Sequence, residues 1–174
     1  IGKTFSATDA GFFNRANTYG IIPNDIFYQV SSKVFFPILS QKQDNDADLL
    51  LSYGKAVRVS MCVYVPFMLG MAALSSPLLE ALVGPKWLPA SPLLTVLCIG
   101  YAFAPMSTLN LNLLYVKGRS DLTLKLDIIK KSLGIAILFA MLPFGIVWMC
   151  VGKAGYELIA FSLNTFYTRK LLGY

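Results

Sequence analysis

Polar side chains recur at helical spacing between residues 10 and 40. Counted from Arg15 at about 100° per residue, they fall within a sector of about 100° on one helix. The sector contains Arg15, Thr18, Ile22, Asp25, Gln29, Ser32 and Lys33. The planar guanidinium group of arginine matches phosphate oxygens in pairs, so Arg15 is the strongest candidate to hold an anionic group. We predict that a polar face made by Arg15, Thr18, Asp25, Gln29 and Lys33 binds a substrate.

Residue types that usually carry catalysis or bind metals are scarce. The chain has no histidine, which removes the usual general base and the commonest metal ligand. Its three cysteines, Cys62, Cys98 and Cys150, lie inside apolar runs, which argues against a disulfide framework and predicts that they pack as small hydrophobic residues. We find no phosphate-binding glycine loop and no nucleophile–base pair. The sequence therefore predicts no catalytic residue, no metal and no cofactor.

Three long apolar runs follow the segment that carries the polar face, and the helices they form must hold it in place. Residues 59–79, 87–116 and 132–152 contain no charged side chain. A helix needs about 20 apolar residues to cross the hydrocarbon core of a bilayer, so all three runs are long enough. The composition agrees, with 14% charged residues and a mean hydropathy of +0.61. We therefore predict a membrane protein.

Five helical segments are predicted from these runs and from the proline and glycine positions. They cover residues 10–40, 47–83, 89–116, 121–149 and 154–172. They form one membrane domain over residues 1–174, an all-α polytopic helical bundle with about five transmembrane helices. Prolines at positions 23, 66, 77, 105 and 143 are expected to break each of the first four segments at least once. Because the chain begins with Ile1, we expect it to be a piece of a longer protein.

Basic residues alternate between the two ends of these segments. One end carries Lys42, Lys55, Arg58, Lys117, Arg119, Lys125, Lys130, Lys131, Arg169 and Lys170. The other end carries only Lys3, Lys86 and Lys153. Since basic residues gather in cytoplasmic loops, we expect the first end in the cytoplasm and the turns at 84–89 and 152–155 outside. The net charge of +6 then indicates topology and contact with anionic membrane lipids, with no nucleic-acid partner.

A membrane location gives the polar face two interpretations. A charged group at bilayer depth costs about 2.5–3.5 kcal/mol on insertion scales, so it usually faces a protein interior or a wet cavity. The face would then line a hydrophilic cavity that crosses the membrane. Alternatively, the segment is an amphipathic helix at the membrane surface, with Arg15 and Lys33 at its edges and Asp25 paired with a basic neighbour. Lys33 and Arg58 are weaker anion-binding candidates than Arg15, because cytoplasmic topology alone explains them.

Four stretches of the chain carry a family resemblance. They are DAGFFNRANTYGIIPNDIFYQVSSKVFFPILS at 9–40, VPFMLGMAALSSPLLEALVGPKWLPASPLL at 65–94, LNLNLLYVKGRSDLTLKLDIIKKSLG at 109–134 and PFGI at 143–146. These stretches resemble the polysaccharide-transporter (Wzx-type) family of lipopolysaccharide and O-antigen flippases. That family belongs to a wider superfamily with the multidrug-and-toxin extrusion (MATE) proteins.

The resemblance implies more than the residue pattern does. It implies two six-helix lobes around a central cavity, with this chain forming most of the second lobe and a missing first lobe as its partner. It also implies movement of undecaprenyl-diphosphate-linked oligosaccharide across the bacterial inner membrane, from the cytoplasmic to the periplasmic leaflet. Basic residues lining the family's cavity are thought to meet the diphosphate. Arg15 lies in the stretch most like the family's NRA or SRA motif.

Two other classes of function compete with this one. An ion-coupled antiporter for drugs or small cations, on the same fold, would use buried acidic residues such as Asp25, Glu80 or Glu157. A membrane-embedded enzyme of glycan assembly would need a large outward loop with clustered catalytic residues. The predicted outward turns are only a few residues long, so we expect a protein that is not an enzyme.

Overall fold

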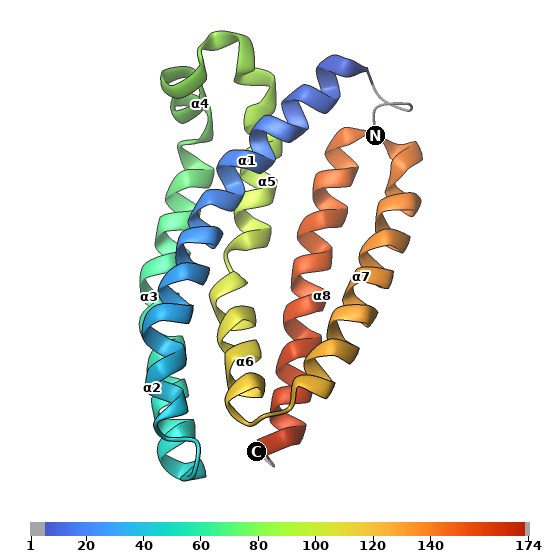
Figure 1. Cartoon of the computed structure of the whole chain (residues 1–174). Coiled ribbons are helices and arrows are strands. Elements are labelled where there is room, and N and C mark those ends of the chain that lie inside the picture. The colour runs from blue at the N-terminus through green and yellow to red at the C-terminus, as the bar shows by residue number, and fades with distance from the viewer. Residues whose placement is uncertain (1–5, 173–174) are drawn as a thin grey trace.

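The structure is a computed structural model that describes residues 6–172, and the side chains of these except Ala7, Leu142 and residues 169–172. All of the secondary structure in this described part is helical. Five long rods pack side by side in an elongated bundle (Figure 1). Three stretches are long and apolar enough to cross a membrane, namely Asp46–Ala73, Pro85–Val116 and Ile146–Thr168. The predicted all-α membrane bundle is therefore confirmed.

The first rod is the element that carries the predicted polar face. It joins α1 (Ala7–Val30), a π-helical turn η1 (Ser31–Phe35) and α2 (Phe36–Ser40) without interruption. The Ser6 side chain caps its start by accepting a hydrogen bond from the Asp9 backbone N–H at 3.1 Å. The predicted segment 10–40 thus starts three residues earlier. The break expected at Pro23 is absent, because the helix continues through this residue and its hydrogen-bonding pattern changes only at η1.

The second and third rods are each divided into two helices. The second consists of α3 (Asp46–Ala73), capped by the Asn45 side chain, and α4 (Ser75–Val83). A 3₁₀ turn η2 (Pro85–Ala90) leads to α5 (Ser91–Tyr101) and α6 (Ala104–Val116). The divisions come just before Pro77 and Pro105, which lack a backbone donor for a continuing helix. The breaks expected at Pro77 and Pro105 are therefore present, whereas α3 continues through Pro66 without a break.

The predicted boundary between the fourth and fifth segments is wrong. Helix α7 (Ser120–Met141) ends eight residues before the predicted end at 149, and α8 (Ile146–Leu172) begins eight residues before the predicted start at 154. The turn is η3 (Leu142–Phe144), followed by Gly145 at φ +101°. Proline cannot donate there, and glycine alone adopts this φ without strain. The run 132–152 is therefore split between two helices and is not one membrane span.

Gly152 and Gly155, which the sequence places in a turn at 152–155, lie inside α8 instead. A Cβ atom on Gly152 would lie 2.8 Å from Met141 Cγ, so this glycine allows α7 and α8 to pack closely. Lys153 consequently lies within a helix and not in an outward turn.

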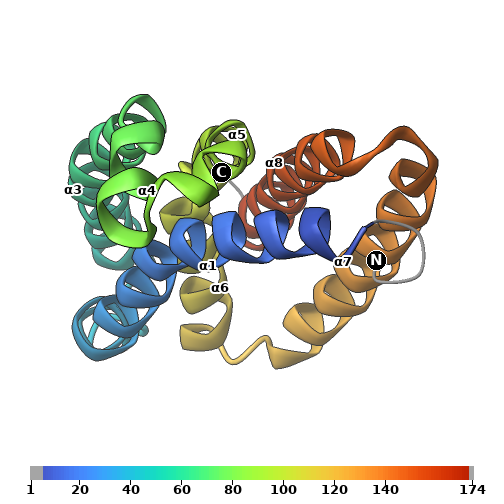
Figure 2. The same ribbon diagram turned by 90° about the horizontal axis from the view of Figure 1, so that it is seen from above.

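Helix α5 is the centre of the packing. It contacts α8, α1 and α3, while α6 lies between α3 and α8, and α7 packs mainly on α8. Figure 1 shows α1 crossing in front of α5, and Figure 2, seen from above, shows α7 at the side of the bundle. Buried side chains of α1, α3 and α5, including Ala16, Met68 and Leu94, form one core cluster. Leu39, Leu109 and other residues form a second cluster nearer the α2 end.

Two ion pairs of the described part lie at the end of the bundle with α2 and the α6–α7 loop. Lys117 pairs with Asp46 and donates a second hydrogen bond to the Gln43 carbonyl oxygen at 2.9 Å. Arg119 hydrogen-bonds Asp121 and holds the pKa of that carboxyl group below its usual value. Part of the basic excess at the predicted cytoplasmic end is thus neutralised within the protein.

A close contact between α5 and α8 leads to the first testable prediction. A Cβ atom added at Gly100 would lie 2.7 Å from Ala154 Cα, whereas one added at Gly70 in α3 would meet nothing within 4 Å. We expect Gly100→Ala to lower the free energy of unfolding of the intact protein by about 1–3 kcal/mol, because the two backbones must separate. Gly70→Ala should leave it unchanged or raise it slightly. Thermal unfolding of both variants in detergent tests this, and equal melting temperatures would contradict the packing.

Candidate functional site

The predicted polar face lies on a side of α1 and η1 that the rest of the described chain leaves largely uncovered. Thr18, Asp25, Gln29 and Lys33 are exposed, and Arg15 is half-buried. The Thr18 hydroxyl donates to the Asn14 carbonyl oxygen at 2.8 Å within the same helix. The residues therefore share a surface, but this chain alone does not enclose them in a cavity. Their role in substrate binding stays a prediction.

The arrangement of the first rod argues against a helix that lies on the membrane surface. Figure 1 shows that α1 and α2 together run from one end of the bundle to the other. Helix α1 packs along α5, which belongs to a stretch apolar enough to cross the membrane. Asp25 also forms no ion pair with any residue of the described part, contrary to the pairing expected for a surface helix.

Arg15 is held at the end of the bundle formed by η2. Its guanidinium carbon lies 4.8 Å from the centroid of the Trp87 ring, a cation–π contact. Phe12 packs edge-on against the same ring, with 5.8 Å between centroids. No hydrogen bond or ion pair from Arg15 to another described residue is present, so its N–H donors are available to an anion. The tryptophan fixes the direction of the side chain without using those donors.

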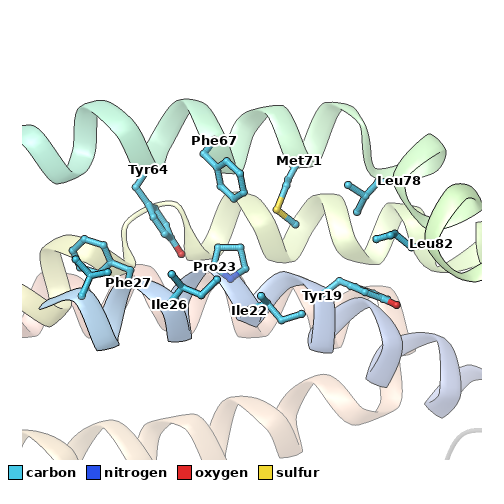
Figure 3. A pocket seen from close by; sticks show the side chains of 11 residues that line it. Tyr19, Ile22, Pro23, Ile26, Phe27, Tyr64, Phe67, Met71, Leu78 and Leu82 are labelled. Carbon is cyan, nitrogen blue, oxygen red and sulfur yellow. The ribbon is translucent and has the colours of Figure 1, made fainter. Parts of the chain in front are cut away.

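An apolar groove lies along α1 beside the polar face. Figure 3 shows it between α1 on one side and α3 and α4 on the other. Its volume is about 480 Å³. It is lined by Tyr19, Ile22, Pro23, Ile26, Phe27, Val30, Tyr64, Phe67, Met71, Leu78 and Leu82. One helix thus offers a polar strip and a hydrocarbon-lined groove next to each other, an arrangement suited to an amphiphile.

A polar cluster that sequence reasoning missed joins α1, α5 and α8. The Tyr101 hydroxyl donates to Asn17 Oδ1 at 3.1 Å, and the Lys153 ammonium donates to the same oxygen. Lys153 Nζ also lies 5.3 Å from the centroid of the Tyr101 ring. Glu157 lies one turn further along α8 and forms no ion pair with a residue of the described part. Ionisable groups inside a membrane bundle are expensive to bury and usually have a function.

The misplaced turn explains why this cluster was missed. A turn at 152–155 would make Lys153 an ordinary residue of an outward loop. A usable signal was present, because Lys153 and Glu157 are spaced four residues apart within a largely apolar run. Its partner Asn17 lies 136 positions away in the chain, so only the fold identifies that contact.

Asparagines connect the helices in the half of the bundle nearer α2. Asn112 Nδ2 donates to Ser31 Oγ at 2.8 Å, which ties α6 to η1. Asn110 accepts a hydrogen bond from the Tyr53 hydroxyl and donates to Thr165 Oγ1 at 3.1 Å, linking α3, α6 and α8. Such interhelical hydrogen bonds hold membrane helices together where no water can satisfy polar groups.

The cysteines fit the packing prediction in part. Cys98 and Cys150 are buried in the larger core cluster, as expected for small hydrophobic residues. Cys62 differs, because it is exposed on the outer surface of α3. All three thiols are free.

The fold and the polar face define a polytopic, all-helical membrane protein. The profile of the family described as "Polysaccharide biosynthesis protein" matches residues 1–92, more than half of the 174-residue chain. The chain therefore belongs to this family, which confirms the resemblance found in the sequence.

Curated relatives agree with the family assignment. The chain is 25% identical to the lipopolysaccharide biosynthesis protein WzxC of Escherichia coli over 95% of its own length and 34% of WzxC. It is 26% identical to the teichuronic acid biosynthesis protein TuaB of Bacillus subtilis over 84% of its own length and 29% of TuaB. It is 23% identical to the succinoglycan biosynthesis transport protein ExoT of Rhizobium meliloti over 95% of its own length and 35% of ExoT. The chain spans about a third of the length of these relatives. No solved structure matches it.

Proposed function

We propose that the intact protein is a flippase that moves undecaprenyl-diphosphate-linked oligosaccharide across the bacterial inner membrane during lipopolysaccharide or exopolysaccharide synthesis. The observation that carries this proposal is the pairing on α1 of a polar strip with an apolar groove. A lipid-linked glycan has the same two halves, a polar diphosphate-sugar and a long hydrocarbon chain. The names of the relatives, which concern the synthesis or transport of polysaccharides, support the same substrate class.

In this proposal each of the five predicted residues of the polar face contacts the part of the substrate that lies nearest to it. Arg15 binds the diphosphate at the η2 end, while Lys33 offers a second cation toward the α2 end. Thr18, Asp25 and Gln29 lie between them and hydrogen-bond sugar hydroxyl groups. The groove between α1, α3 and α4 receives the polyprenyl chain, whose transfer out of water is favourable.

The protein partner in this proposal is a first lobe of the same protein. The exposed polar strip of α1 would face that lobe, so that the two together enclose a wet cavity in the membrane. Neither catalytic residues nor a cofactor are needed, because the substrate is moved and not chemically changed. The ion-coupled antiporter has less support, since the relatives are named for polysaccharide biosynthesis.

A gene-deletion experiment tests the proposal. Cells that lack the intact protein are expected to lose surface polysaccharide and to accumulate diphosphate-linked oligosaccharide in the inner membrane, and the wild-type gene should reverse both effects. Surface glycan is measured by antibody or lectin binding, and the lipid-linked precursor by extraction and mass spectrometry. Normal surface glycan together with altered drug sensitivity would instead support the antiporter.

A further inference from the structure

A second, smaller pocket opens between α3, α6 and α8, away from the groove that borders the polar face. Its volume is about 240 Å³. It is lined by Tyr53, Gly54, Val57, Arg58, Met106, Asn110, Thr165 and Thr168. In contrast to the apolar groove, its lining includes hydroxyl groups, a carboxamide and a guanidinium group. None of these lining residues is acidic.

The position of this pocket corresponds to the boundary of the hydrocarbon core. Arg58 on α3 is the last charged residue before the uncharged run 59–79. On α6, Asn110 lies seven residues before Lys117, which ends the uncharged run 87–116. Both helices therefore pass from apolar to charged surroundings near the pocket. With the predicted topology, the phosphates of the cytoplasmic leaflet would lie at about this level.

The floor of the pocket is fixed by hydrogen bonds. The fully buried Asn110 side chain accepts a hydrogen bond from the Tyr53 hydroxyl and donates one to Thr165 Oγ1. Three helices are thereby tied together at one carboxamide. A site held in this way does not need to be ordered when a ligand binds.

Two polar groups at the pocket have no partner among the described residues. Thr168 is only 3% exposed, and its Oγ1 makes no hydrogen bond within this part of the chain. The Arg58 side chain is exposed and forms no ion pair with a described residue. A buried hydroxyl without a partner is costly where lipid replaces water, and a free guanidinium group is suited to phosphate oxygens. Together they offer donors to one anionic group.

We propose that this pocket binds the phosphate of an anionic phospholipid from the cytoplasmic leaflet. Arg58 would donate to the phosphate oxygens, Thr168 would donate from its hydroxyl, and the absence of acidic lining residues would exclude repulsion. Basic pockets between transmembrane helices commonly bind anionic headgroups in this way. This inference does not depend on the proposed transport function, because this pocket shares no lining residue with the apolar groove or the polar face.

Native mass spectrometry of the intact protein in detergent tests the lipid assignment. Phosphatidylglycerol and phosphatidylcholine are titrated separately, with inorganic phosphate as a competitor. We expect the wild-type protein to bind phosphatidylglycerol about tenfold more tightly than phosphatidylcholine. The Arg58→Ala variant should bind phosphatidylglycerol about tenfold more weakly than the wild-type protein does. Thr168→Val, which keeps the side-chain shape, should weaken binding by about threefold to tenfold.

Lys55 provides the matched control. It is exposed on α3 three residues before Arg58 but does not line this pocket, so Lys55→Ala should change the affinity less than twofold. Equal losses in Lys55→Ala and Arg58→Ala would show unspecific charge attraction and overturn the proposal. Equal binding of the two lipids would also overturn it. So would displacement of phosphatidylglycerol by millimolar inorganic phosphate, because the site would then select a soluble anion.

Discussion

Replacing Arg15 by alanine is expected to abolish export of the glycan by the intact protein. The change removes the cation that we place on the diphosphate, while Trp87 and Phe12 remain packed against each other. Loss of a charge-assisted, two-pronged contact to phosphate should reduce export by much more than tenfold. The measurement is surface glycan in deletion cells that carry the variant, at equal amounts of protein in the membrane. Arg15→Lys should restore only part of the activity, because lysine cannot donate in pairs.

Lys86 is the matched control for the Arg15 experiment. It is exposed in η2, next to Trp87, and belongs to neither the polar face nor the groove. Lys86→Ala should therefore export normally. Wild-type export by Arg15→Ala would remove Arg15 from the mechanism. If Asp25→Asn stopped transport while Arg15→Ala did not, an ion-coupled antiporter would become the better interpretation.

Replacing Lys153 by methionine is expected to destabilise the intact protein substantially. The variant loses the hydrogen bond from α8 to Asn17 and removes the cation one turn before Glu157, while Lys130 stays ion-paired with Asp127 at 2.9 Å. Losing a hydrogen bond from a charged group costs about 1.5–3 kcal/mol, and Lys153 is half-buried, so we expect a loss of this size. Thermal unfolding of the purified protein in detergent measures it.

A double variant separates lost charge balance from lost packing. Lys153→Met combined with Glu157→Gln should unfold at a higher temperature than Lys153→Met alone, because the uncompensated carboxylate is gone. Lys131→Met serves as the control, since Lys131 is exposed on α7 and forms no ion pair with a described residue. Equal melting temperatures for Lys153→Met and Lys131→Met would show that the cluster around Asn17 contributes nothing to stability.

Contacts between distant parts of the chain also explain the errors in the sequence-based prediction. Four glycine and proline positions near residues 143–155 could each have marked the fourth turn. Gly145 forms it with Pro143, while Gly152 serves close packing of α7 on α8. Whether a glycine forms a turn or allows a close contact between helices depends on its neighbours in the folded structure. That information is absent from the local sequence, and the misplaced turn concealed Lys153.

The sequence by itself determined the membrane character, the helical content and the polar face of the first rod. These properties depend on local hydropathy and on helical periodicity, which need no knowledge of the neighbouring helices. Only the tertiary structure decided that Trp87 covers Arg15, that α3 and α4 complete an apolar groove beside the polar strip, and that Lys153 meets Asn17. Each of these contacts joins residues far apart in the chain. Their proximity follows from how the rods pack and from no pattern within a single rod.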